Sequence, residues 1–134
     1  MRLMVMLLLL LGASTPAFAA DQFDLACQGT RISTRGAPAE PYASRVRIDL
    51  AARKWCTDAC ERLADISEVK PDRIVLTDDL IYNTSSDFSN AVSVDRTSYD
   101  FHQLSSQDRP ISKYLKVDAA CTLQPFGGLP AAKS

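Results

Sequence analysis

The chain has 134 residues, of which 46% are hydrophobic and 23% charged, and its formal net charge at pH 7 is −1. This length suits one domain with a modest core. Charges of both signs are interspersed, without the basic stripe typical of nucleic-acid binding or the basic amphipathic stretch typical of a membrane surface. We therefore expect one small globular domain that binds no nucleic acid.

The first twenty residues have the layout of a secretory signal peptide. Arg2 supplies a positive start, residues 3–11 form an unbroken apolar run, and residues 17–19 read Ala-Phe-Ala. The apolar run is too short to span a bilayer as a helix. We predict cleavage after Ala19, because cleavage after Ala20 would place Phe18 where a small side chain is needed. The mature chain then has 115 of the 134 residues, a net charge of −2 and no apolar segment of membrane-spanning length. Its predicted location is periplasmic or secreted.

All four cysteines lie in the mature part, at Cys27, Cys56, Cys60 and Cys121. An even number of cysteines in an exported chain indicates disulfides, and four cysteines allow three connectivities. We favour Cys56–Cys60, which can pair locally across a turn. We also favour Cys27–Cys121, because both residues lie on the apolar faces of predicted strands at the two ends of the domain.

Apolar residues that recur at every second position predict a mainly β fold. The first strand carries Phe23 to Cys27 and ends at Gly29. A loop follows at 33–41, where one glycine and two prolines oppose regular structure. The clearest strand is 45–50, in which three aliphatic residues alternate with charged ones, and after a turn 55–56 begins a return strand.

The second half of the chain continues the pattern after an ambiguous stretch at 57–69. There Leu63, Ile66 and Val69 fit the spacing of a short helix, although the stretch has no clear cap. A further strand is predicted from Ile74 to its end at Asp78-Asp79, and 80–82 continues in extended form before a loop at 83–87. Strands are also predicted at 92–95, 99–101 and 115–123, with a turn at 96–98 and a break at Pro110.

These elements predict a single antiparallel meander that forms a sandwich or a barrel, with six to eight short strands. The expected fold is mainly β, with room for one short helix and two disulfides. The domain is predicted to cover residues 20–126, and residues 127–134 are predicted to form a flexible tail.

The one local motif with chemical potential is the Cys-x-x-x-Cys sequence at 56–60. It could be a redox-active dithiol, for which Arg53 and Lys54 are candidate stabilising cations, or it could hold copper together with a histidine. The chain has one histidine, His102. A hydrolase site would also have to use His102, and no glycine-flanked serine motif accompanies it. We interpret the motif as a structural disulfide and His102 as a surface residue.

Two acidic pairs and one glycosylation sequence complete the candidates. Asp78-Asp79, or Asp58 with Glu61 if that stretch is helical, could serve glycoside cleavage or bind calcium, but solvated turns are the simpler interpretation. The Asn83-Thr84-Ser85 acceptor sequence is discounted because the leader is typical of bacteria. We therefore predict no catalytic, cofactor-binding or metal-binding residues.

Several short segments together resemble a known group of proteins. They are FDLACQGT at 23–30, RIDL at 47–50 followed by KWC at 54–56, then Cys60, DRTSY at 95–99 and CTLQPF at 121–126. The chain is similar to a loose group of small, mostly uncharacterised, exported proteobacterial proteins. The resemblance implies a periplasmic location and a β structure supported by disulfides, and it implies no substrate.

The sequence thus predicts a non-enzymatic binding or interaction module of the cell envelope. Its partner would be an envelope protein or a small molecule, bound at an edge strand or an open barrel mouth. The alternative is a thiol-redox or copper-handling protein that uses Cys56 and Cys60, and a small hydrolase built on His102 ranks last.

Overall fold

The computed structural model describes residues 21–130, which are all-β and contain no helix. The predicted leader and its cleavage site at Ala19 lie outside the described residues. The strands within 21–130 are β1 (Gln22–Ile32), β2 (Glu40–Asp49), β3 (Lys54–Thr57), β4 (Ala64–Asp65), β5 (Glu68–Val69), β6 (Arg73–Tyr82), β7 (Asp87–Asp95), β8 (Phe101–Arg109) and β9 (Lys113–Gln124).

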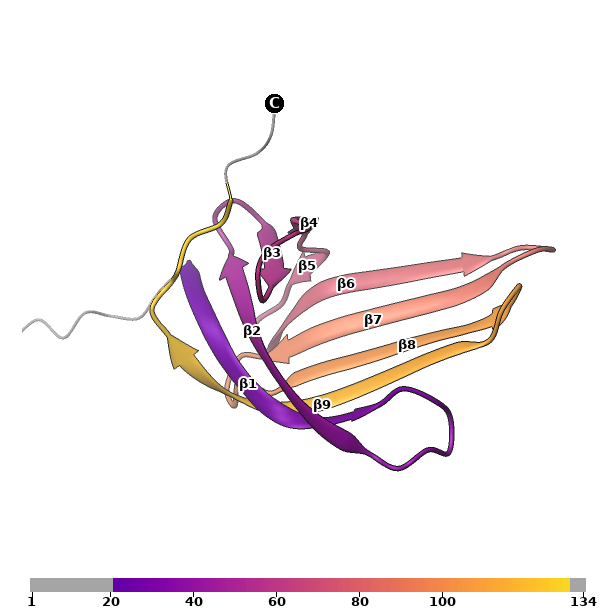
Figure 1. Ribbon diagram of the computed structural model, residues 1–134. Helices are drawn as coiled ribbons and strands as arrows, with labels where there is room; N and C mark the ends of the chain where they lie inside the picture. Colours follow the sequence, from indigo (N-terminus) through magenta and orange to yellow (C-terminus); the bar gives the residue numbers. More distant parts are fainter. Residues whose placement is uncertain (1–20, 131–134) are drawn as a thin grey trace, which may run out of the picture.

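The strands form one antiparallel sheet in the order β4-β3-β2-β1-β9-β8-β7-β6-β5. Consecutive strands are neighbours in the sheet, except that β4 and β5 lie at its two ends. In addition, β9 returns to pair with β1 over the register Asp24↔Gln124 to Ile32↔Lys116. The sheet curls so that β1–β3 face β6–β8 in a half-barrel (Figure 1). The predicted fold class, an antiparallel meander with two disulfides, is confirmed.

The half-barrel is closed at one end by residues 64–69, which pass from the β3 edge of the sheet to the β6 edge. The amide of Ile66 donates to the carbonyl of Arg53 at 2.9 Å, and the amide of Ser67 donates to the carbonyl of Leu76 at 3.2 Å. The short helix considered for 57–69 is therefore wrong. The backbone beside β3 and the backbone of β6 accept these hydrogen bonds, so residues 64–69 are extended. The side chain of Ile66 enters the core.

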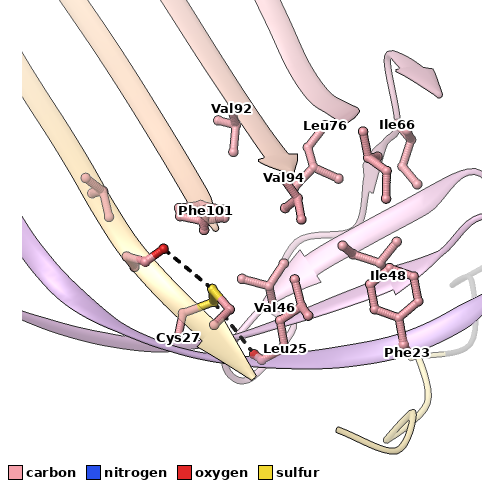
Figure 2. Close-up of a cluster of buried hydrophobic side chains, with 14 residues drawn as sticks. Phe23, Leu25, Cys27, Val46, Ile48, Ile66, Leu76, Val92, Val94 and Phe101 are labelled. Carbon is pink, nitrogen blue, oxygen red and sulfur yellow. Dashed lines mark hydrogen bonds between the residues drawn. A yellow bond between two sulfur atoms is a disulfide. The ribbon is translucent and has the colours of Figure 1, made fainter. Parts of the chain in front are cut away.

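The core lies between the two halves of the curled sheet. Phe23, Leu25, Val46 and Ile48 from β1 and β2 face side chains from β6–β8 (Figure 2). Full burial of such a side chain stabilises the fold by about 1.5–3 kcal/mol. The buried cluster is completed by Cys27, Ile66, Ile74, Leu76, Val92, Val94, Phe101, Val117, Ala119 and Cys121.

The described residues form nine strands where six to eight were expected, and several predicted strand boundaries are wrong. The first strand does not end at Gly29, because β1 continues to Ile32. A Cβ atom at Gly29 would lie 2.0 Å from the carbonyl oxygen of Asp118, so glycine permits the close approach of β1 and β9. The predicted loop at 33–41 also ends early, because β2 begins at Glu40 and includes Pro41. Proline is tolerated there because that part of β2 pairs only with β1 among the described residues.

The strands β6–β9 continue well beyond the core. Burial on their inner face stops at Leu76 in β6, Val92 in β7, Phe101 in β8 and Val117 in β9. We call the remainder of these strands (77–82, 87–91, 102–109 and 113–116) the distal sheet. It projects away from β3–β5 in Figure 1. β6 forms the outer strand of the distal sheet, because β5 is too short to cover it.

Candidate functional site

The bridge between Cys27 and Cys121 joins directly opposed residues of β1 and β9. Both cysteines lie in the core, where they are 2% and 9% exposed. The predicted connectivity is therefore confirmed. This bridge closes a loop of 94 residues by sequence separation and ties the first and last strands of the domain together.

The second predicted bridge, between Cys56 and Cys60, is also present and closes a short loop after β3. Its cysteines are 2% and 8% exposed, so both sulfur atoms are largely shielded from an exchange partner. Lys54, a candidate cation for a reactive thiolate, forms an ion pair with Asp65. Arg53, the other candidate cation, is exposed and forms no ion pair within residues 21–130. The two disulfides together suggest an oxidising, extracytoplasmic setting.

His102 lies on the outer face of the sheet, where it contacts Asp118 of β9. The distance between its Nδ1 atom and the Oδ1 atom of Asp118 is 2.8 Å, and the Nζ atom of Lys116 lies 3.7 Å from Oδ2. Ser93 is opposite His102 in the register. No hydrogen bond joins the Ser93 and His102 side chains in the part of the chain that the structure describes. Because the His102 side chain is 53% exposed, the pair is a surface interaction of about 1 kcal/mol or less.

The interpretation of Asp78-Asp79 as a solvated turn is wrong, because both residues lie within β6, and neither acidic pair forms a shared carboxylate site. Asp78 and Asp79 are consecutive residues of β6, so their side chains point to opposite faces of the sheet. Asp58 and Glu61 lie in the non-helical loop after β3. Residues 21–130 contain no group of three or more His, Cys, Asp or Glu side chains that could hold a metal ion.

Asn83 and Asp95 stabilise the turns at the two ends of β7. The Oδ1 atom of Asn83 accepts hydrogen bonds from the amides of Ser85 and Ser86 at 2.9 and 2.7 Å. The carboxylate of Asp95 accepts the amides of Ser98 and Thr97 at 2.8 and 2.7 Å, and these bonds lower the pKa of Asp95. The polar side chains therefore act on their own turns.

A buried carboxylate at Asp24 was not anticipated. Alternation in β1 places Asp24 on the face opposite Phe23 and Leu25, yet it is 0% exposed. The Nε atom of Arg45 lies 2.5 Å from its Oδ2 atom, and that of Arg47 lies 3.8 Å away. Gly127 lies against Asp24, and Arg47 donates to the carbonyl of Gly128 at 2.9 Å. The start of the predicted tail therefore covers the carboxylate, and residues 131–134 lie outside the described part.

The outer edge of β6 in the distal sheet was also not anticipated. β5 pairs with β6 only through Val69↔Ile74 and Glu68↔Val75, and Ser67 extends this contact to Leu76. From residue 77 to 82, β6 pairs with β7 on one side and, within residues 21–130, with nothing on the other. Alternate residues of this six-residue stretch thus present their amide and carbonyl groups at an open sheet edge, which can accept another strand.

The side chains of this edge are unusually apolar for an exposed strand. Leu80, Ile81 and Tyr82 are 76%, 48% and 77% exposed. Because side chains alternate along a strand, Leu80 and Tyr82 lie on one face of the distal sheet and Ile81 on the other. We call residues 77–82 of β6 the open edge. Both of its faces present apolar surface beside unpaired backbone groups.

The opposite margin of the half-barrel is protected. Residues 46–49 of β2 pair with β3, and the backbone of Arg45 exchanges hydrogen bonds with Asp58. Pro41 lies further along the same edge and has no amide hydrogen to offer. Proline is one of the devices by which proteins prevent an edge from pairing with another chain. β6 has a register shift between Val75 and Thr77, where the open edge begins, and from residue 78 to 82 it carries no proline or further bulge.

A small surface depression adjoins the open edge at its β5 end. It has a volume of about 150 Å³, with an apolar part formed by Val75, Ala91 and Val92 and a charged rim that includes Lys70 and Arg73. Lys70 is engaged with Glu68 at 3.7 Å. The depression lies where a strand added to the open edge would begin, so it could receive one side chain of that strand.

Together these features define a class of structure: an all-β, disulfide-bonded half-barrel with one protected and one open sheet edge. Its described part includes no helix that is long and apolar enough to cross a membrane. Comparison with protein-family models, curated proteins and solved structures gives no match. The open edge of β6 is the feature of this structure that points to a function.

Proposed function

We propose that the protein is a periplasmic, non-enzymatic binding module of the cell envelope that holds an extended segment of another protein along the open edge of β6. The observation that carries this proposal is the coincidence of unpaired backbone with exposed apolar side chains at Leu80, Ile81 and Tyr82. In strand addition, backbone hydrogen bonds supply affinity and alternate side-chain contacts supply specificity.

The dimensions of the open edge fit a short peptide segment. Six residues of strand span about 20 Å. The added strand would bury less surface than a standard protein–protein interface, so we expect an affinity of about micromolar. The distal sheet is anchored through β8 and β9 to the core and the Cys27–Cys121 bridge, so it offers a preorganised template.

Site-specific photo-cross-linking in cells tests the proposal. A benzoylphenylalanine residue is introduced at position 80 or 82 and, as a control, at position 111. Ile111 is 65% exposed between β8 and β9, so it is similarly accessible but lies away from the open edge. We expect defined adducts from positions 80 and 82 and none from position 111, with the cross-linked site in an extended segment of the partner. Equal adducts from all three positions, or none from the open edge, would refute the proposal.

A further inference from the structure

The charge of the open edge points to the chemistry of its partner. We infer that β6 accepts an extended segment that carries adjacent basic residues flanked by apolar ones. This inference rests on the proposed function and adds to it the sign and position of the partner's charge. Its basis is the pair Asp78-Asp79, which stands in the first half of the open edge.

The two carboxylates are not neutralised by the protein itself. Asp78 and Asp79 are exposed, and neither forms an ion pair within residues 21–130. The nearest cations along β6 are Lys70, Arg73 and Arg109. Arg73 lines the same depression as Asp78 but forms no ion pair with it within residues 21–130. At the β5 end Lys70 contacts Glu68, and at the far end Arg109 donates to the carbonyls of Asn83 and Thr84.

An added strand would place its side chains beside these carboxylates. Residues directly opposite in antiparallel strands have Cβ atoms about 4.5–5.5 Å apart. Because Asp78 and Asp79 point to opposite faces, two adjacent residues of the partner can each meet one of them. Two lysines or arginines at those positions would increase affinity by about 2- to 30-fold.

The rest of the open edge selects apolar neighbours for the basic pair. On one side, Leu80, Ile81 and Tyr82 offer apolar surface on both faces of the sheet. On the other side lies the depression, whose lining combines Val75 and Ala91 with charged and polar residues that include Arg73 and Asp78 itself. A segment with a basic pair opposite Asp78-Asp79 and β-branched residues opposite Leu80 to Tyr82 would therefore match the edge.

The same charges argue against a second copy of the chain as the occupant. Two protomers joined through β6 would bring four aspartates onto one pair of strands, and none of them has a cationic partner there. The protected margin of β2 offers no alternative edge for a second copy, because Pro41 has no backbone amide hydrogen to donate to an added strand. A basic partner relieves this repulsion, whereas a second copy increases it.

Fluorescence anisotropy with three labelled peptides tests the inference on the mature protein with both disulfides intact. The peptides are acetylated and amidated, alternate threonine and valine, and differ only in a central Lys-Lys, Gln-Gln or Glu-Glu pair. We expect the Lys-Lys peptide to bind about 2- to 30-fold more tightly than the Gln-Gln peptide and the Glu-Glu peptide to bind most weakly. The preference should decrease as salt is added.

Matched variants locate the effect. The double variant Asp78→Asn/Asp79→Asn should bind the Lys-Lys and Gln-Gln peptides equally. The control Asp21→Asn/Glu61→Gln removes two exposed carboxylates away from β6 and should keep the full preference. N-methylation of alternate amides along one edge of the Lys-Lys peptide should abolish binding, whereas methylation along its other edge should not.

The outcomes separate the two proposals. If all three peptides bind equally and Asp78→Asn/Asp79→Asn has no effect, the charge inference is overturned while strand addition to β6 stands. If no peptide binds and the cross-links from position 80 are absent, both proposals fail. Sedimentation that shows a dimer, lost in Leu80→Gln/Tyr82→Gln, would replace the basic partner by a second copy.

Discussion

The Cys27–Cys121 bridge should be the largest single covalent contribution to the stability of this domain. In the chain-entropy description, a disulfide stabilises the fold by restricting the unfolded chain, and the effect grows with the closed loop. For the sequence separation of 94, the variant Cys27→Ala/Cys121→Ala should lose about 4–5 kcal/mol. Small domains have total stabilities of about 5–15 kcal/mol, so much of the margin depends on this bridge.

The second disulfide provides an internal control for this magnitude. Cys56–Cys60 has a sequence separation of 4, for which the same relation gives about 2 kcal/mol. All four sulfur atoms belong to buried residues, so each double Cys→Ala variant loses a comparable amount of packing. The difference between the two variants therefore isolates the loop-length effect, which should be about 3 kcal/mol.

Equilibrium urea unfolding of the mature protein, followed by the fluorescence of Trp55, measures both losses. The comparison should use free energies extrapolated to zero urea, because removing a long-range bridge expands the unfolded chain and changes the m-value. Equal losses from Cys27→Ala/Cys121→Ala and Cys56→Ala/Cys60→Ala would refute the loop-length argument. Strain or residual structure in the unfolded chain would then determine the effect.

Two further predictions concern carboxylates. Asp24→Ala should lower the free energy of unfolding by about 1.5–3 kcal/mol, because it removes the carboxylate that accepts a charge-assisted hydrogen bond from Arg45 and lies beside Arg47, both of which keep some access to solvent. Asp65→Ala, which breaks the exposed pair with Lys54, should cost about 1 kcal/mol or less, and equal losses in urea unfolding would contradict this reasoning. The pKa of Asp95 is lower in the folded protein than its ordinary value of 3.8, which applies to the unfolded chain. The contribution of Asp95 to stability is therefore complete above pH 3.8 and is lost as the pH falls through the pKa of the folded protein. The difference in urea midpoint between the wild type and Asp95→Asn should therefore shrink in that acidic range, and a difference that stays constant down to about pH 2 would show that the pKa is not shifted.

Local patterns were sufficient to predict the fold class and the disulfides. Val46 and Ile48 alternate with charged residues, and this period of two matches the geometry of a strand with one buried face. Cys27 and Cys121 share the apolar phase of their strands, so their pairing followed from the same pattern. The alternation depends on residues close in sequence, which is why the sequence determines it by itself. The Cys27–Cys121 pairing, across a separation of 94, was only favoured among three connectivities.

Contacts between distant segments decided the features that the sequence did not reveal. Gly29 stays within β1 because the backbone of β9 approaches it, and residues 64–69 are extended because β3 and β6 take their hydrogen bonds. Asp24 is buried because the segment at Gly127 covers it.

The open edge has the same origin. Leu80 to Tyr82 read as an ordinary strand, and only the short pairing between β5 and β6 leaves that strand uncovered. The alternation of side chains along one strand determines which face is apolar. The strand's neighbours, which lie elsewhere in the chain, determine whether its backbone is paired.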